Sequence, residues 1–150
     1  MYIVKFRLLG FLVIFIALFS VSSAVFSSKS RAASIVAKVD VSEQLMRVYV
    51  NGKRFYTWRV STGRGRYHTP RGSYRPTFLK RMHYSSKYNN SPMPWSIFFK
   101  GGYAIHGTNY IKSLGRPASH GCIRLHPAAA RELYNLVKRN RGRTRIVIRN

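Results

Sequence analysis

Apolar and polar residues alternate along several short segments of the chain after position 34. Such alternation, in segments rich in valine, isoleucine and aromatic residues, is typical of β-strands with one buried face. Asn51-Gly52 separates two of these segments and favours a tight type I′ hairpin turn. The strands predicted in this way are 35–41, 45–50, 55–60, 73–79, 95–99, 103–106, 123–125 and 144–148.

One segment has the spacing of a helix instead. Pro127 suits a first helical turn, and Leu133, Leu136 and Val137 form one apolar stripe after it. Residues 62–90 are rich in Gly, Arg, Tyr and Ser, so we expect loops there around a single strand. The pattern as a whole predicts a mainly β fold, in one domain with one or two short helices.

The N-terminal segment has the composition of a secretory signal peptide. Lys5 and Arg7 precede an apolar run that ends in a Ser-x-Ala site at Ala24. An uncleaved membrane anchor is the alternative, because the apolar stretch can be extended to Phe26. In that case the segment would be the chain's contact with a membrane. The predicted segments are a signal peptide (1–24), a Ser-rich linker (25–34) and a folded domain (35–150), in a protein exported to the periplasm or cell-wall space.

The charge balance is strongly basic. The chain has 27 Lys and Arg residues against 3 Asp and Glu, a formal net charge of +24. Ion pairs within the chain cannot neutralise this excess, so we expect either a solvated basic surface or an anionic partner. For an exported protein the candidates are cell-wall polymers, anionic lipid and acidic peptide, with nucleic acid as the weaker alternative.

The chain has a single cysteine, Cys122, preceded by Gly121 and His120. One cysteine in an oxidising compartment indicates either an intermolecular disulfide or a reactive free thiol. Because Gly121 permits an unusual backbone angle, the amides of 120–122 could converge on one point and hold an oxyanion. An ordinary thiol is mostly protonated at neutral pH and needs a base. We expect a hairpin-like return of the chain to bring His106 beside Cys122 as that base.

Plainer interpretations of these residues remain open. Cys122 could be a small buried hydrophobe, and His106 and His120 could be structural. A zinc site built from all three lacks the spacing of paired cysteines, so no metal or cofactor is expected.

The segments Ser119-His120-Gly121-Cys122 and, upstream, His106-Gly107 together form a specific pattern. With them the chain resembles the L,D-transpeptidases with a YkuD-type catalytic domain, over nearly all of its length after the predicted signal peptide. The other segments that carry the resemblance are Val39-Asp40-Val41-Ser42-Glu43-Gln44, Ser61-Thr62-Gly63, Thr69-Pro70-Arg71-Gly72, Ser91-Pro92-Met93-Pro94, Ile105 to Asn109, Leu114 to Ala118 and Ile123-Arg124-Leu125.

The resemblance implies a mainly β sandwich and an activity on peptidoglycan peptide stems. Members use the cysteine to attack the third residue of a tetrapeptide stem, release the terminal D-alanine, and pass the acyl group to an amine, as in a 3-3 crosslink. By this resemblance Cys122 is the nucleophile and His106 the general base and acid. The backbone carbonyl of Gly107 is expected to orient the imidazole of His106.

The resemblance also implies roles for the neighbouring residues. Ser119, His120 and Gly121 would shape the turn that carries the nucleophile. Arg124 would support the site or bind a substrate carboxylate, although many members have asparagine at this position. The candidates for substrate binding are Met93, Trp95, Tyr103, Thr108, Asn109 and Arg124.

Two other functions are compatible with the same residues. One is an L,D-carboxypeptidase or amidase of the same fold, in which water takes the acyl group. The other is a non-catalytic wall-binding protein that uses the fold and its charge. The basic stretch from Arg64 to Lys87, which is interleaved with tyrosines, could follow a phosphate backbone. Because an exported chain rarely meets nucleic acid, we interpret it as a groove for an acidic stem or an anionic wall polymer.

Overall fold

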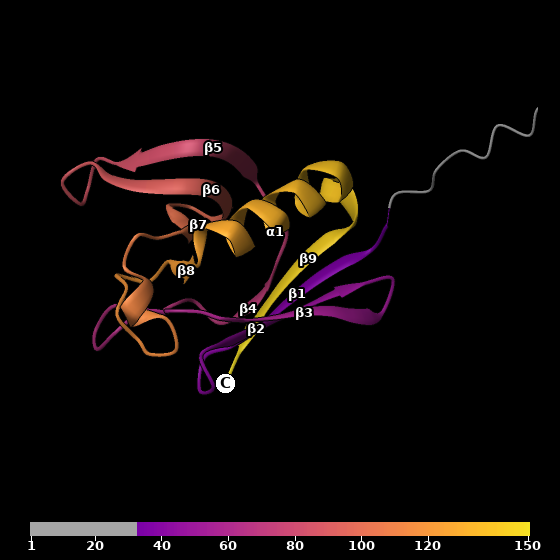
Figure 1. Cartoon of the computed structure of the whole chain (residues 1–150), viewed down its shortest axis with the longest axis horizontal. Coiled ribbons are helices and arrows are strands. Elements are labelled where there is room, and N and C mark those ends of the chain that lie inside the picture. The colour runs from indigo at the N-terminus through magenta and orange to yellow at the C-terminus, as the bar shows by residue number, and fades with distance from the viewer. Residues whose placement is uncertain (1–32) are drawn as a thin grey trace, which may run out of the picture. The chain divides into compact units, whose positions relative to one another are not determined.

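The computed structural model describes residues 33–150, so the predicted signal peptide and most of the predicted linker lie outside the described residues. Residues 33–150 form nine strands, one α-helix and two short 3-10 turns (Figure 1). The prediction of a mainly β fold is therefore confirmed. None of the helices in this part of the chain is long and apolar enough to span a bilayer.

Five strands form one sheet in the order β3-β2-β1-β9-β4. β1 and β9 run parallel, and the other neighbouring pairs are antiparallel. β9 therefore lies inside this sheet, between β1 and β4 (Figure 1). The bounds of the strands are β1 Ile35–Asp40, β2 Leu45–Val50, β3 Lys53–Arg59, β4 Gly72–Tyr74 and β9 Thr144–Arg149.

The other four strands form a second sheet in the order β5-β6-β7-β8. β5, β6 and β7 are antiparallel neighbours, whereas β7 and β8 run parallel. The bounds are β5 Phe78–Ser85, β6 Ser91–Lys100, β7 Tyr103–Gly107 and β8 Ile123–Leu125. The helix α1 (Pro127–Asn140) follows β8, and the 3-10 turns cover Ile111–Ser113 and Arg141–Arg143.

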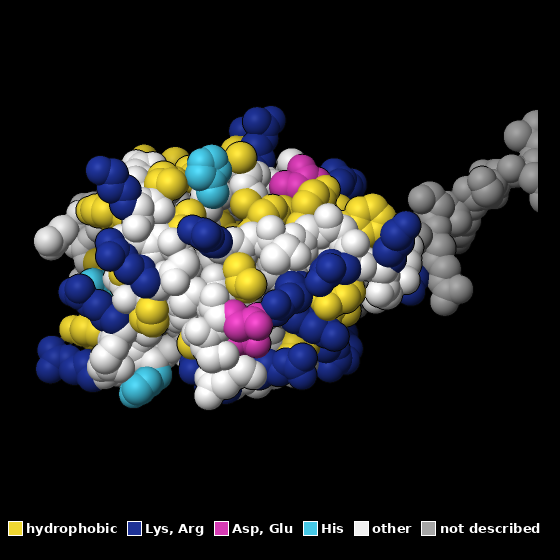
Figure 2. All heavy atoms as spheres, turned by 60° about the horizontal axis from the view of Figure 1, so that its bottom comes forward, with side chains coloured by type: hydrophobic (Ala, Val, Ile, Leu, Met, Phe, Trp, Pro, Cys, Tyr) yellow, Lys and Arg dark blue, Asp and Glu magenta, His cyan; other side chains and the backbone are white. Residues whose placement is uncertain are grey.

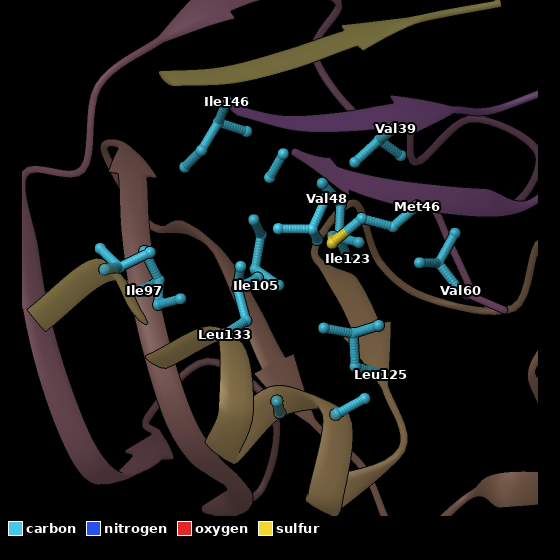
Figure 3. Packing of buried hydrophobic residues seen from close by; sticks show 14 of the residues in the cluster. Val39, Met46, Val48, Val60, Ile97, Ile105, Ile123, Leu125, Leu133 and Ile146 are labelled. Atoms are coloured by element: carbon cyan, nitrogen blue, oxygen red, sulfur yellow. The ribbon is translucent and has the colours of Figure 1, made fainter. Parts of the chain in front are cut away.

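The main core contains one face of each sheet and the apolar face of α1 (Figure 3). Val48 comes from the five-stranded sheet, Ile105 and Ile123 from the four-stranded sheet, and Leu133 from α1; all four are at most 1% exposed. Burial of each such side chain stabilises the fold by about 1.5–3 kcal/mol. At the start of α1 the ring of His126 accepts a hydrogen bond from the amide of Ala128 at 3.3 Å, beside the predicted Pro127.

The predicted turn at Asn51-Gly52 is confirmed. Asn51 has φ 50° and Gly52 has φ 83°, so both central residues are left-handed, as a type I′ turn requires. The prediction of one strand near 73–79 is wrong, because this region contains β4 and the start of a separate strand, β5. β6 also begins four residues before the predicted position, at Ser91, despite the prolines at 92 and 94.

Trp95 introduces a kink within β6. It has φ 58°, a left-handed conformation that a bulky residue seldom adopts. Side chains on a regular strand alternate between faces, yet Met93 and Phe98, an odd number of residues apart, belong to the same small apolar cluster. The kink at Trp95 therefore reverses the alternation and turns both of these side chains to the sheet face opposite the main core.

Lys and Arg side chains spread widely over the surface. On the face drawn in Figure 2 the dark blue basic side chains are scattered among white and yellow atoms, and the magenta acidic side chains are sparse. Among residues 33–150 the only ion pair joins Arg47 to Glu43, at 2.6 Å. The expected shortage of internal ion pairs is therefore confirmed for this part of the chain.

The Asn51-Gly52 turn gives a prediction that separates backbone strain from packing. A Cβ added at Gly52 or at Gly142 would meet nothing within 4 Å, and of the two only Gly52 has a positive φ. We expect Gly52→Ala to lower the free energy of unfolding by about 1 kcal/mol, and Gly142→Ala to leave it within about 0.5 kcal/mol. Equilibrium urea unfolding of both variants measures this. Equal losses in both would contradict the turn assignment.

Candidate active site

A pocket of about 870 Å³ opens on the four-stranded sheet, on the face opposite the main core. Loops around the sheet supply its walls: the loop after β3, the turn that joins β5 to β6, and the long connection between β7 and β8. Both Cys122 and His106 line it. A second hollow, of about 480 Å³, lies beside Glu43 and Arg59 and has neither a histidine nor the cysteine in its lining.

The pairing of β7 with β8 explains why these two residues share the pocket. Ile105 lies opposite Ile123, and His106 lies opposite Arg124. Since side chains alternate along both strands, the isoleucines enter the main core while His106, Cys122 and Arg124 lie on the pocket side. The expected hairpin-like return is wrong. The strands are parallel, because the chain crosses back through residues 108–122 before β8 begins.

His106 is buried, at 6% exposed, and its ring is held by its neighbour in the chain. Nδ1 lies 2.7 Å from the carbonyl oxygen of Gly107. A carbonyl can only accept a hydrogen bond, so Nδ1 carries the proton and Nε2 keeps a free lone pair. Burial lowers the pKa of His106 to about 4, the charges of Arg124 and His83 lower it as well, and the Gly107 carbonyl partly opposes this. The imidazole is therefore neutral at pH 7.

Cys122 is a free cysteine whose sulfur lies 3.8 Å from the carbonyl oxygen of Gly102. Burial raises the pKa of the thiol, and the amide of Ala104 and the charge of Arg124 oppose this only in part. The thiol is therefore protonated at pH 7. The site thus contains a neutral thiol and a neutral imidazole, rather than a thiolate and an imidazolium.

Ser119 holds the turn that carries the cysteine. Its fully buried hydroxyl donates to the carbonyl of Cys122 at 2.6 Å and accepts from the amide of Gly121 at 3.0 Å. The expectation that all three amides from 120 to 122 are free is therefore wrong at Gly121. The amides of His120 and Cys122 have no acceptor among residues 33–150, and these two remain available to an oxyanion.

Gly121 is required at its position by both conformation and space. Its φ is 110°, and a Cβ added there would lie 2.7 Å from the ring of Tyr103. The site therefore uses Gly121 to bring the backbone of the turn against Tyr103. Tyr103, one of the predicted substrate-binding residues, also lines the pocket.

Buried polar side chains hydrogen-bond the backbone of this turn. The sequence alone did not predict this role. Thr69 donates from its hydroxyl to the carbonyl of Gly121 at 2.8 Å. The carbonyl of Thr62 accepts from the amide of Ser119 at 2.9 Å, and Gln44 bonds both the amide and the hydroxyl of Thr62. These residues occur in segments that carry the family resemblance, and the resemblance implies no role for them. The only signal for this role in the sequence is that polar residues occur beside the segments predicted to be strands.

His120 joins two walls of the pocket. Its ring stacks on Tyr88, with centroids 4.5 Å apart, and meets the edge of Tyr67 at 4.6 Å. Tyr88 belongs to the turn between β5 and β6, and Tyr67 to the loop after β3. This contact ties the end of the β5-β6 hairpin to the far side of the pocket.

The remaining candidates divide into two groups. Met93, Thr108, Asn109 and Arg124 line the pocket, as does Tyr103. Trp95 is not among the residues that line it. Its ring packs on Tyr134 of α1, at 5.5 Å between centroids, and the guanidinium groups of Arg81 and Arg131 lie 5.3 Å and 5.7 Å from its centroid. Over residues 33–150 no three His, Cys, Asp or Glu side chains are grouped as a metal ion would require.

Comparison with known proteins identifies the family. The family model for the YkuD L,D-transpeptidase catalytic domain matches residues 34–148. The YkuD protein of Bacillus licheniformis is 29% identical over 106 residues, and that of Bacillus subtilis is 27% identical over 103. Each alignment covers 66% of this chain and 58% of the relative, so the chain spans less than two thirds of the length of these relatives.

Solved structures share the fold. An L,D-transpeptidase from Mycobacterium smegmatis has a TM-score of 0.71 and 20% identity, over 79% of this chain and 59% of that one. An L,D-transpeptidase from Xylanimonas cellulosilytica has a TM-score of 0.68 and 27% identity, over 80% of this chain and 62% of that one.

The lowered pKa of His106 predicts how stability depends on pH. In the unfolded chain this histidine titrates near 6.5, and in the folded protein it resists protonation down to about 4. The unfolded state binds more protons between these values, so the stability present above pH 6.5 is lost as the pH falls toward 4. We expect wild type to lose about 3 kcal/mol more than His106→Asn between pH 7 and pH 4. Urea unfolding across this range measures it, and parallel curves would show that His106 titrates normally.

The two hydrogen bonds of the Ser119 hydroxyl give a second prediction. Ser119→Ala leaves the Gly121 amide and the Cys122 carbonyl without this buried partner, so we expect the free energy of unfolding to fall by about 2–3 kcal/mol. Ser73→Ala is the control, because Ser73 is exposed and contacts only Arg145 through its hydroxyl at 3.2 Å. It should cost about 0.5 kcal/mol or less. Similar losses of unfolding free energy in the two variants would argue against a stabilising role of the Ser119 hydroxyl.

Proposed function

The chain belongs to the family of YkuD L,D-transpeptidase catalytic domains, and from this membership we propose that it is a cysteine-dependent L,D-transpeptidase that acts on peptidoglycan tetrapeptide stems. The observation that carries the proposal is the pair formed by Cys122 and His106. His106 lies on β7, and Cys122 directly precedes the adjacent parallel strand β8. Both line one pocket, and Nδ1 of the histidine is already bound to a backbone carbonyl. The remaining lone pair of the imidazole is free to take a proton.

In the first step His106 accepts the thiol proton of Cys122 on Nε2 as the sulfur attacks the carbonyl carbon of the third stem residue. The amides of His120 and Cys122 are the proposed donors to the oxyanion that forms. Collapse of this intermediate breaks the carbon-nitrogen bond to the terminal D-alanine. The proton on His106 then passes to the leaving nitrogen, and a thioester remains on Cys122.

In the second step an amine attacks the thioester, His106 takes up the amine proton, and the thiol is regenerated with that proton. A new amide bond replaces the thioester. The energy of the original amide is kept in the acyl-enzyme, so the exchange needs no ATP. When the amine belongs to another stem, the product is a 3-3 crosslink.

The neutral resting pair determines when the nucleophile forms. A pKa of about 4 makes His106 a weak base, and burial disfavours the thiolate of Cys122. The proton therefore moves only when a carbonyl is in place to receive the sulfur. This arrangement keeps the free thiol poorly reactive toward other electrophiles.

The proposal includes export, because peptidoglycan lies outside the cytoplasmic membrane. The segment 1–24 is the proposed signal peptide, and 35–150 the proposed catalytic domain. Anionic wall polymers are further proposed partners, on the basis of the net charge of +24.

Mass spectrometry with synthetic tetrapeptide stems tests the reaction. We expect wild type to gain the mass of the acyl tripeptide on Cys122 and to release D-alanine, and Cys122→Ala to do neither. His106→Asn should acylate about 10²–10⁴-fold more slowly, because it removes the base. Circular dichroism of both variants serves as the control for folding.

The products identify the acceptor. New stem dimers that Cys122→Ala does not form support the transpeptidase. Release of tripeptide alone, with an adduct on Cys122, would replace it by a carboxypeptidase. The absence of any adduct on folded protein that still binds isolated walls would replace it by a non-catalytic wall-binding protein.

A further inference from the structure

All three acidic side chains of the chain are engaged outside the pocket. Glu43 pairs with Arg47 at 2.6 Å. Asp40 accepts hydrogen bonds from the hydroxyl of Ser42 and the amide of Glu43, and Glu132 accepts from the hydroxyl of Tyr56 at 3.2 Å. The chain therefore offers no carboxylate that could neutralise a cation within the pocket.

The pocket nevertheless contains several cations. Arg64 and Arg66 come from the loop after β3, and Lys87 comes from the turn between β5 and β6. Arg66 and Lys87 lie over the rings of Tyr67 and Tyr88, at 5.3 Å and 5.7 Å from the centroids. These are the same two tyrosines that contact His120, and the amide of Arg64 donates to the carbonyl of the neighbouring Ser119 at 3.1 Å. The three residues therefore lie at one end of the pocket.

The fourth cation, Arg124, lines the same pocket as Cys122. It lies on β8, two residues after Cys122, and is only partly exposed. It donates to the carbonyl of Ala118 at 3.3 Å and lies 5.6 Å from the ring of Tyr110. A guanidinium has five N–H donors, and burying part of it without an anion is costly. Arg124 therefore presents unmet donors to the pocket at the position of the chemistry.

We propose that the pocket selects its donor stem by charge, taking stems whose carboxyl groups are free in preference to stems in which they are amidated. This inference rests on the proposed function and names the substrate class of the same site. Arg124 binds the carboxylate nearest the bond that is broken. Arg64, Arg66 and Lys87 bind a carboxylate farther along the stem, at the end of the pocket marked by His120.

Amidation of a stem carboxyl group changes the charge of the substrate with little change in its shape. It replaces a carboxylate by a neutral carboxamide of nearly the same size, so shape and most hydrogen bonding are kept while the charge is lost. In a pocket with four cations and no acid, the carboxylate gains charge-assisted hydrogen bonds that the carboxamide cannot match. These bonds form on binding, so the preference should appear mainly in KM.

The experiment compares two synthetic tetrapeptide stems that differ only in a free or an amidated carboxyl group on the second residue. We measure D-alanine release by wild type and by the variant Arg64→Gln, Arg66→Gln, Lys87→Gln. Wild type should prefer the free acid by about 10-fold or more in kcat/KM at low salt, as one charged hydrogen bond predicts. The triple variant should reduce this ratio to about 1, through KM.

The matched control variant removes three positive charges outside the pocket. Arg54, Lys138 and Arg139 are exposed and do not line the pocket. Their combined change to glutamine should keep the wild-type ratio. A control variant that loses the ratio as fully as the pocket variant would show that only net charge matters, and would overturn the assignment to the pocket.

Binding to Cys122→Ala, which cannot be acylated, separates this inference from the proposed function. Calorimetry with the same two stems should give a lower Kd for the free acid by about the same factor. Equal affinities, or tighter binding of the amidated stem, would overturn charge selection even if acylation occurs. Selective binding to Cys122→Ala with no acylation of wild type would uphold charge selection and overturn the transpeptidase.

Discussion

The parallel pairing of β7 with β8 is the constraint on which the site depends. Only three residue pairs form it, yet they send Ile105 and Ile123 into the main core and His106 and Arg124 into the pocket. A slip of one residue would reverse every one of these directions. So short a pairing is supported from outside the sheet, by the bridge between Ser61 and Arg124 and by the hydroxyl of Ser119.

The positive charge in the pocket favours the neutral form of basic groups within it. Burial lowers the pKa of His106, and the positive charge of Arg124 acts in the same direction to a smaller extent, so the imidazole is neutral at pH 7. The same field favours the neutral form of an incoming amine over its ammonium form, and only the neutral form is a nucleophile. The surrounding cations thus assist the second half of the proposed reaction as well as the binding of an anionic donor.

The sequence could predict those structural features that depend on residues close together in the chain. The alternation from 35 to 60, the turn at Asn51-Gly52 and the start of α1 at Pro127 are all local patterns, and the structure has them. The parallel direction of β8 and the support that Thr69 gives to Gly121 join segments far apart, and no local pattern contains them. The kink at Trp95 was also hidden, because its aromatic side chain favours an ordinary strand while packing against Tyr134 holds it in a left-handed conformation.

The position of β9 has a consequence for the order of events during biosynthesis. Residues 144–149 form an inner strand, and β1, more than a hundred residues earlier, has β9 as one of its two neighbours. The five-stranded sheet therefore cannot close until these residues have left the ribosome, and such distant pairing is slow to form. Late folding suits the proposed export, because a chain that has not yet folded can pass extended through a protein-conducting channel, and its thiol would then meet the histidine only on the far side.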